Sequence, residues 1–160
     1  SSPLNWSWDG WAFRVIHPSP ALPYYGNDSS CVISIQSGNT GVLLSGDISK
    51  TVENRLVLDG LSQHRVLLVP HHASNTSSSR DLIDQAAPSF AIATAGLGNR
   101  FGFPRDEVME RYDTAGVTFW WTGECGALRL RLNGTGRVQA SSARRSQKRI
   151  WRWPAGRHCP

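Results

Sequence analysis

The sequence predicts an α/β fold built on a mixed β-sheet. Short apolar runs rich in β-branched residues alternate along the chain with segments of helical spacing, and this alternation is typical of stacked layers of strands and helices. Two pairs of apolar runs are separated only by short turns that contain glycine and asparagine, which favours antiparallel hairpins. A sheet that combines hairpins with strand–helix–strand units contains both parallel and antiparallel strands.

The expected elements follow from these patterns in chain order. Strands are expected at residues 11–17, 31–36, 42–45, 65–69, 89–94, 117–121, 127–132 and 137–140. Helices are expected at residues 49–58, at 78–87 and from 104 to about 112–115. Gly60 ends the first helix, residues 78–81 can cap the second before Pro88 stops it, and Pro104 suits the first turn of the third.

Length and composition fit one soluble domain. A chain of 160 residues can bury a real core, and 39% hydrophobic with 18% charged residues is ordinary for an α/β protein. No apolar run approaches the roughly 18 residues that would span a membrane, and the N-terminus lacks a signal-peptide pattern. The chain opens without an initiator methionine, so we expect it to be a piece of something longer.

The net charge of +5 is unevenly placed. The last twenty residues hold six of the 17 bases and none of the 12 acids. We therefore divide the chain into a nearly neutral domain at residues 1–140 and a basic, flexible tail at 141–160 that includes Trp151 and Trp153. This tail could contact phosphates and stack on bases, or it could be a merely solvated end.

The cysteines give little information. Cys31, Cys125 and Cys159 are odd in number and have no CxxC spacing, so they predict neither a disulfide framework nor a zinc finger. They also leave the cellular compartment open.

Potential metal ligands follow two of the predicted strands. Asp47 comes just after residues 42–45, and His71 and His72 come just after residues 65–69. An imidazole and a carboxylate at neighbouring strand ends can share a divalent metal, since both are Zn²⁺ ligands. The alternative is that Asp47 caps the following helix and the histidines are ordinary loop residues. Two or three ligands are also too few for a closed metal site.

Common nucleotide and hydrolase motifs are missing, which leaves Asp47 and the histidine pair as the main candidates for chemistry. Gly96 and Gly98 lack the third glycine of a dinucleotide fingerprint, and there is no GxxxxGK[ST] sequence. The GxSxG elbow of serine hydrolases does not occur either.

Four ordered segments resemble a known family. They are residues 27–32 (NDSSCV), 43–48 (LLSGDI), 69–78 (VPHHASNTSS) and 98–104 (GNRFGFP). Together they resemble the C-terminal metallo-β-lactamase-like domain of ComEC, the membrane protein of bacterial DNA internalisation during competence. The resemblance runs from about residue 11 to about residue 132.

The resemblance implies a metallo-β-lactamase-like αββα sandwich, of which this chain is the C-terminal half. It further implies two divalent metals, Zn or Mn, and metal-dependent phosphodiester hydrolysis of the non-transported DNA strand. The expected partners are DNA, the upstream half of the same domain, the transmembrane channel of the parent protein and other competence proteins. The expected location is the extracytoplasmic, periplasmic side of the bacterial inner membrane.

Individual residues carry this resemblance. Asp47 matches the family's metal-bridging aspartate, and the His71–His72 pair matches its late histidine ligand, without indicating which of the two binds. The residues that match polar loops beside the cleft, where substrate would bind, are Ser74, Thr76, Ser77, Asn99 and Arg100.

The sequence also departs from the family. The first metal motif, of the form HxxxxDH, lies upstream of these segments in the family, and no histidine precedes His17 here. We therefore expect upstream residues to complete the two-metal site and the fragment alone to be inactive. Ala73 replaces a frequent glycine and Phe103 a frequent histidine. Two alternatives stay open: a zinc hydrolase of another substrate, or a non-catalytic DNA-binding or structural half-domain that uses Arg100 and the tail.

Overall fold

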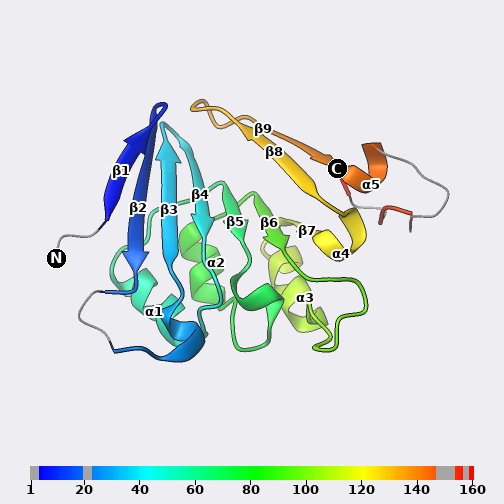
Figure 1. The fold of residues 1–160 in the computed structure, drawn as a ribbon, viewed down its shortest axis with the longest axis horizontal. Coiled ribbons are helices and arrows are strands. Elements are labelled where there is room, and N and C mark those ends of the chain that lie inside the picture. The colour runs from blue at the N-terminus through cyan, green and yellow to red at the C-terminus, as the bar shows by residue number, and fades with distance from the viewer. Residues whose placement is uncertain (1–3, 20–22, 147–153, 157–158) are drawn as a thin grey trace.

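The computed structural model describes residues 4–19, 23–146, 154–156 and 159–160. In this part of the chain, a seven-stranded sheet has the order β1-β2-β3-β4-β5-β6-β7, and β8 and β9 form a second, two-stranded sheet (Figure 1). The strands are β1 (Asn5–Trp8), β2 (Trp11–His17), β3 (Val32–Ser37), β4 (Thr40–Leu44), β5 (Val66–Leu68), β6 (Phe90–Ala93), β7 (Thr118–Trp121), β8 (Leu128–Leu132) and β9 (Val138–Ser142). The helical segments are η1 (Gly26–Ser29), α1 (Lys50–Leu58), η2 (Pro70–Ala73), α2 (Arg80–Ala86), α3 (Asp106–Thr114), α4 (Thr122–Cys125) and α5 (Ala143–Ser146).

The mixed sheet and nearly all of the predicted elements are confirmed. Strands β1 to β4 pair antiparallel, and β4 to β7 pair parallel. Ser49 and Ser79 cap α1 and α2 with their side chains, as helix N-terminal serines commonly do. Strand β1 was not predicted, because its four residues are all exposed and lack a buried face.

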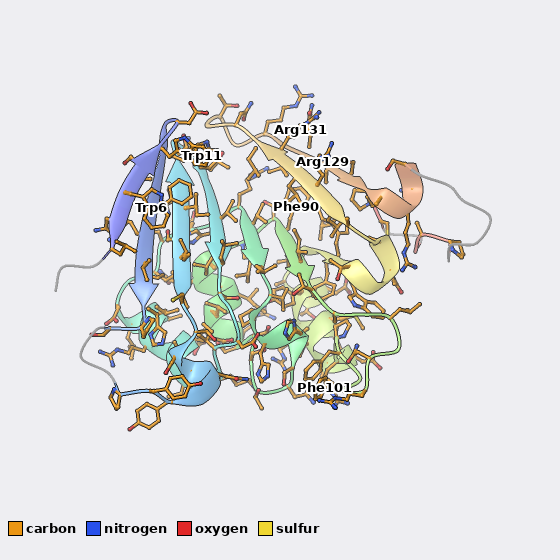
Figure 2. All side chains as sticks on the ribbon, viewed as in Figure 1. Trp6, Trp11, Phe90, Phe101, Arg129 and Arg131 are labelled. Atoms are coloured by element: carbon orange, nitrogen blue, oxygen red, sulfur yellow. A yellow bond between two sulfur atoms is a disulfide. The ribbon has the colours of Figure 1, made fainter. Side chains whose placement is uncertain are left out.

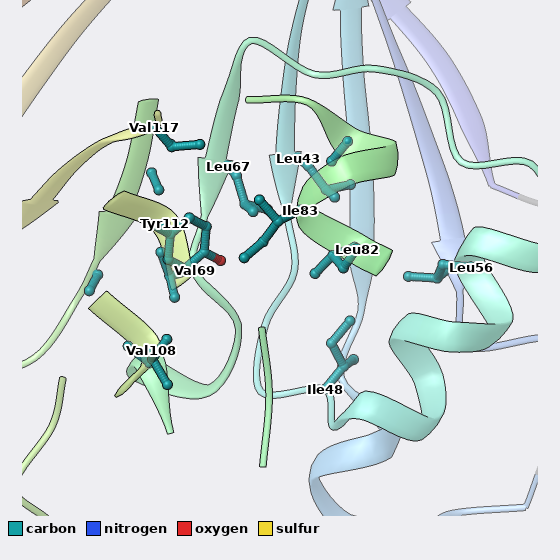
Figure 3. Close-up of a cluster of buried hydrophobic side chains, with 14 of the residues drawn as sticks. Leu43, Ile48, Leu56, Leu67, Val69, Leu82, Ile83, Val108, Tyr112 and Val117 are labelled. Carbon is teal, nitrogen blue, oxygen red and sulfur yellow. The ribbon is translucent and has the colours of Figure 1, made fainter. Parts of the chain in front are cut away.

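The main core lies between the sheet and helices α1, α2 and α3 (Figure 3). Leu43, Leu67 and Ala91 are in register on neighbouring strands, so their side chains point to the same face of the sheet. This face meets the buried sides of the helices, including Ile83 of α2 and Tyr112 of α3.

The hairpin β8–β9 covers the opposite face of the parallel strands. The alternation of leucine and arginine in β8 places its leucines inward, where they pack on a cluster that includes Val66, Ile92 and Trp120. Phe90 stacks on Trp120 there, with ring centroids 5.0 Å apart. Arg129 and Arg131 are exposed on the outer side of the hairpin (Figure 2).

The same sheet face continues over β1 and β2 as an aromatic face made of Trp6, Trp8, Trp11 and Phe13. Trp6 is paired with Phe13 in the ladder, and their rings stack with centroids 4.8 Å apart. Trp6 is 41% exposed and Trp8 73% exposed. Figure 2 shows Trp6 and Trp11 on β1 and β2, the two strands at this edge of the sheet. A substantial apolar surface is therefore left in contact with solvent at this edge.

The C-terminal boundary and the cysteine prediction need correction. The predicted boundary at residue 140 falls inside β9, and residues 143–146 form α5, so the first part of the predicted tail belongs to the fold. Cys125 and Cys159 form a disulfide, contrary to the sequence-based expectation. Their separation of 34 residues gives no local signal, so only the fold brings them together. Trp151 and Trp153 lie outside the described residues.

Buried His64 should make the protein sensitive to mild acid. Its Nε2 lies 2.7 Å from Ser34 Oγ, and burial lowers the pKa of the imidazole from its ordinary 6.5. Below pH 6.5 the unfolded chain therefore takes up a proton that the native His64 resists. The free energy of unfolding consequently decreases as the pH is lowered through this range.

We expect His64→Gln to flatten the acid side of the stability profile. Urea unfolding at about pH 7.5 and about pH 5.5 gives the free energy of unfolding at each pH. Between the two, this free energy should drop more in the unmodified protein than in His64→Gln, by up to about 1.4 kcal/mol per pH unit for one proton. Equal losses in the two proteins would contradict this assignment.

No helix in the described residues is long and apolar enough to cross a membrane.

Candidate metal centre

The candidate centre lies where the parallel strands β4, β5 and β6 end. Asp47 is in the loop after β4, His71 and His72 are in η2 just after β5, and Thr94 directly follows β6. Because these three strands are parallel neighbours, the loops after them meet at one edge of the sheet. Ligands commonly bind at this edge in α/β sheets.

Asp47 does not cap α1, so the structure excludes this alternative. The N-cap of α1 is Ser49, whose side chain accepts a hydrogen bond from Thr51 N. Ser49 is held in turn by the Asp28 carboxylate, which accepts bonds from its backbone N at 2.8 Å and its Oγ at 2.9 Å. Asp47 uses its backbone N to donate to Ser30 Oγ. Its carboxylate faces His72 instead of the helix.

Asp47 and His72 meet as the sequence predicts. Asp47 Oδ1 lies 3.4 Å from His72 Nε2, and the two side chains are 40% and 42% exposed. This separation is longer than an ordinary hydrogen bond. It matches the roughly 3.4 Å between two ligand atoms that bind one tetrahedral Zn²⁺ with bonds of about 2.0–2.1 Å. The pair is thus spaced for a shared cation and open to solvent.

A contact with Thr94, just after β6, determines which ring nitrogen of His72 carries a hydrogen. Nδ1 lies 2.6 Å from the backbone oxygen of Thr94, and a carbonyl oxygen only accepts, so Nδ1 carries the hydrogen. In the neutral imidazole, Nε2 then presents its lone pair to the Asp47 carboxylate. Two such electron-rich atoms repel each other unless a proton or a metal ion lies between them. A backbone carbonyl behind the far nitrogen is the usual support of a metal-binding histidine.

His71 is engaged differently. The Asn27 amide nitrogen lies 3.2 Å from His71 Nε2 and donates to it. Nδ1 consequently holds the hydrogen and lies 3.2 Å from Thr76 Oγ1. Both ring nitrogens of His71 are thus used by neighbouring loops. Of the two histidines, His72 is the one whose free nitrogen faces Asp47.

The backbone of the histidine pair is strained. His71, His72 and Ala73 have φ values of 47°, 54° and 65°, a left-handed region that costs non-glycine residues on the order of 1–3 kcal/mol each. His71 N donates to the carbonyl of Gly46, and Arg105 N donates to that of Ala73. These contacts hold the turn in its conformation. Strain that is kept in place in this way commonly occurs at functional sites.

Buried Glu53 anchors the loop that follows the histidines. Its carboxylate accepts hydrogen bonds from Ser78 N at 2.6 Å and Ser79 N at 2.7 Å. Arg111 Nη1 donates to the carbonyls of Ser77 and Ser78, and Tyr112 donates to Ser78 Oγ. Burial raises the pKa of Glu53 from its ordinary value. This anchor cannot be recognised from the sequence, because a glutamate in a helix has no local mark of burial.

The residues predicted to bind substrate lie around this centre. Ser74 is buried with Oγ 3.1 Å from Thr76 Oγ1, so both belong to the chain of contacts that supports His71. Ser77 Oγ donates to the carbonyl of Pro70. Asn99 and Arg100 lie in the loop after β6, where Arg100 is exposed. Their contacts with a substrate stay predictions.

In the described part of the chain, no group of three or more His, Cys, Asp or Glu side chains is placed to hold a metal ion. Asp47 and His72 fit two positions of such a site by chemistry and spacing. Further ligands would have to come from elsewhere.

Residues 1–94 match the sequence profile of the Metallo-beta-lactamase superfamily, and the chain belongs to this superfamily. The superfamily implies binding of divalent metal, typically zinc, which fits the Asp47–His72 pair.

Within the superfamily, the chain resembles competence proteins. It is 34% identical over 142 residues, or 88% of its length, to Competence protein ComA of Neisseria gonorrhoeae. It is 36% identical over 67% of its length to Recombination protein 2 of Haemophilus influenzae, and 30% identical over 74% to ComE operon protein 3 of Bacillus subtilis. These matches confirm the predicted resemblance to the ComEC family. They cover 20%, 14% and 16% of the respective relatives, so the chain corresponds to a small part of each.

Proposed function

We propose that this chain is part of a divalent-metal-dependent nuclease of competence, which hydrolyses the non-transported DNA strand during DNA internalisation. The observation that carries the proposal is the 3.4 Å separation between His72 Nε2 and the Asp47 carboxylate at the end of the parallel strands, in a chain whose relatives are competence proteins. Nitrogen and carboxylate ligands suit Zn and Mn alike, so both metals remain part of the proposal.

Each residue has a distinct part in the proposed mechanism. His72 and Asp47 would hold metal, and residues of the upstream half of the domain would supply the other ligands. Bound metal would activate water and stabilise the charge that develops on the leaving oxygen. The carbonyl of Thr94 keeps the His72 proton on Nδ1. Asn27 and Thr76 keep His71 in place, and Arg100 offers a cation to a phosphate.

The proposal extends to partners and location. The half-exposed aromatic face of β1 and β2 supports packing against the upstream half of the domain, since an apolar surface of this kind is usually covered. The transmembrane channel of the parent protein and other competence proteins are the further partners. The Cys125–Cys159 disulfide supports a periplasmic location, because disulfides persist mainly in oxidising compartments.

A non-catalytic role is the second candidate. The described residues contain only two well-placed ligands, which favours a DNA-binding or structural half-domain over a zinc hydrolase of another substrate. In that case Arg100 and the basic C-terminal residues would contact DNA.

Nuclease assays on the longer protein and on these 160 residues separate the two candidates. We expect the longer protein to cut DNA in a reaction that EDTA stops and Asp47→Asn abolishes. The 160-residue chain should bind metal weakly and cut no faster than buffer does. Longer protein that binds DNA but does not cut it when Zn or Mn is supplied would instead support the non-catalytic role. Robust, chelator-sensitive cutting by the 160-residue chain would show that it contains further ligands.

A further inference from the structure

The loop between β6 and α3 displays two stacked aromatic rings at the surface. Phe101 and Phe103 lie with centroids 5.6 Å apart and planes inclined by 18°. Phe101 is 54% exposed, and Figure 2 shows it at the end of the molecule opposite the arginines of β8. The guanidinium of Arg100 lies over the Phe101 ring, 4.7 Å from its centroid. We refer to Arg100, Phe101, Phe103 and Arg105 as the aromatic shelf.

The shelf is held in shape by Asn99. Its Oδ1 accepts hydrogen bonds from the backbone N of Phe101 at 3.2 Å and of Phe103 at 3.1 Å. Its Nδ2 donates to the carbonyls of Gly96 and Phe103. The amide therefore fixes the backbone on both sides of Phe101. The rings are presented by an ordered loop, so little conformational entropy remains to be lost when a ligand binds.

The shelf adjoins the candidate metal centre. Phe103 contacts His71 edge to face, with centroids 6.0 Å apart, and Arg105 N donates to the carbonyl of Ala73 beside His72. The Arg105 guanidinium lies 5.6 Å from the Phe103 centroid. Two aromatic rings flanked by two cations thus extend outward from the histidine pair.

We propose that the aromatic shelf is a binding subsite for single-stranded nucleic acid, with a base stacked on Phe101 and neighbouring phosphates bound by Arg100 and Arg105. Any base can stack on an aromatic ring, and exposed rings among cations are a common arrangement for single strands. The exposed Arg100 can move from the ring to a phosphate while the base takes its place. Bases within a duplex are already stacked, so the subsite selects unpaired strands. The inference rests on the proposed function, because it specifies the form of DNA that reaches the same metal centre.

Binding is measured by fluorescence anisotropy on the full chain carrying Asp47→Asn, without added metal. The probes are a labelled single-stranded oligonucleotide of about 15 nucleotides, its duplex, and a version with abasic sites. Phe101→Ala removes the ring, and Phe101→Tyr retains a stacking surface. Leu97→Ala is the matched control, since Leu97 is a 48% exposed apolar residue in the same loop. Thermal unfolding of each variant checks that the fold is intact.

We expect Phe101→Ala to weaken single-strand binding about tenfold or more, as loss of one stacked base does. Duplex binding should not change, Phe101→Tyr and Leu97→Ala should bind normally, and abasic sites should mimic Phe101→Ala. Unchanged single-strand binding, or an equal loss for duplex, would overturn the subsite. Anionic phospholipid vesicles serve as a further probe, by co-sedimentation: if Phe101→Ala lost binding to them while single-strand binding stayed unchanged, the rings would belong to a membrane surface and the subsite would be overturned. Since the assay needs no metal and no cleavage, its outcome is independent of whether the protein is a nuclease.

Discussion

Replacing His72 by alanine is expected to remove most of the metal affinity of the longer protein, whereas replacing His71 should reduce it far less. His72 offers a free Nε2 to the shared position with Asp47, while both nitrogens of His71 bind neighbouring loops. Loss of a supporting residue typically lowers affinity about 10–100-fold, and loss of a ligand should exceed this. Competition with a zinc-binding dye measures both variants directly.

The two variants control for each other, because the two histidines are adjacent and share the same strained turn. His72→Ala and His71→Ala should therefore disturb the backbone to a similar degree, and thermal unfolding of the metal-free proteins can verify this. Equal metal affinities in the two variants, or a larger loss for His71→Ala, would refute the assignment of His72 as the ligand.

Replacing Glu53 by alanine should be among the most destabilising single changes in the chain. It would leave the buried N–H of Ser78 and the half-buried N–H of Ser79 without their acceptor, and an unpaired buried group costs about 1–3 kcal/mol. We expect a loss of about 2–5 kcal/mol in the free energy of unfolding, with weaker metal binding because the loop after the histidines loosens. Glu110→Ala, at an exposed position of α3, is the control and should have little effect.

Glu53→Gln adds a pH test of the same anchor. Burial raises the pKa of Glu53 above its ordinary 4.5, so the native state holds its proton more tightly than the unfolded chain does. The stability gained in this way is complete below pH 4.5 and is lost as the pH rises through the native pKa. Glutamine does not titrate, so the advantage of the unmodified protein over Glu53→Gln should shrink as the pH rises. A difference that stays constant with pH would contradict the raised pKa.

Much of the fold could be predicted because its signals are local. The apolar run before Pro70 and the serines before α1 and α2 define strands and helix starts over a few residues. Strand β1 could not be predicted, since all four of its residues are exposed and neither of its faces is buried against the core. The Cys125–Cys159 bond was missed for another reason, namely that chain spacing says nothing about which cysteines the fold brings together.

For the candidate site, the sequence by itself determined that Asp47 and the two histidines follow neighbouring strands, because apolar periodicity marks where strands end. Only the tertiary structure shows that it is His72, and not His71, whose ring faces Asp47. Adjacent residues look equivalent in sequence, but a left-handed turn directs their rings to different partners, the carbonyl of Thr94 for His72 and the amide of Asn27 for His71. Those partners lie 22 and 44 residues away, and hydrogen-bond geometry across such distances exists only in the folded chain.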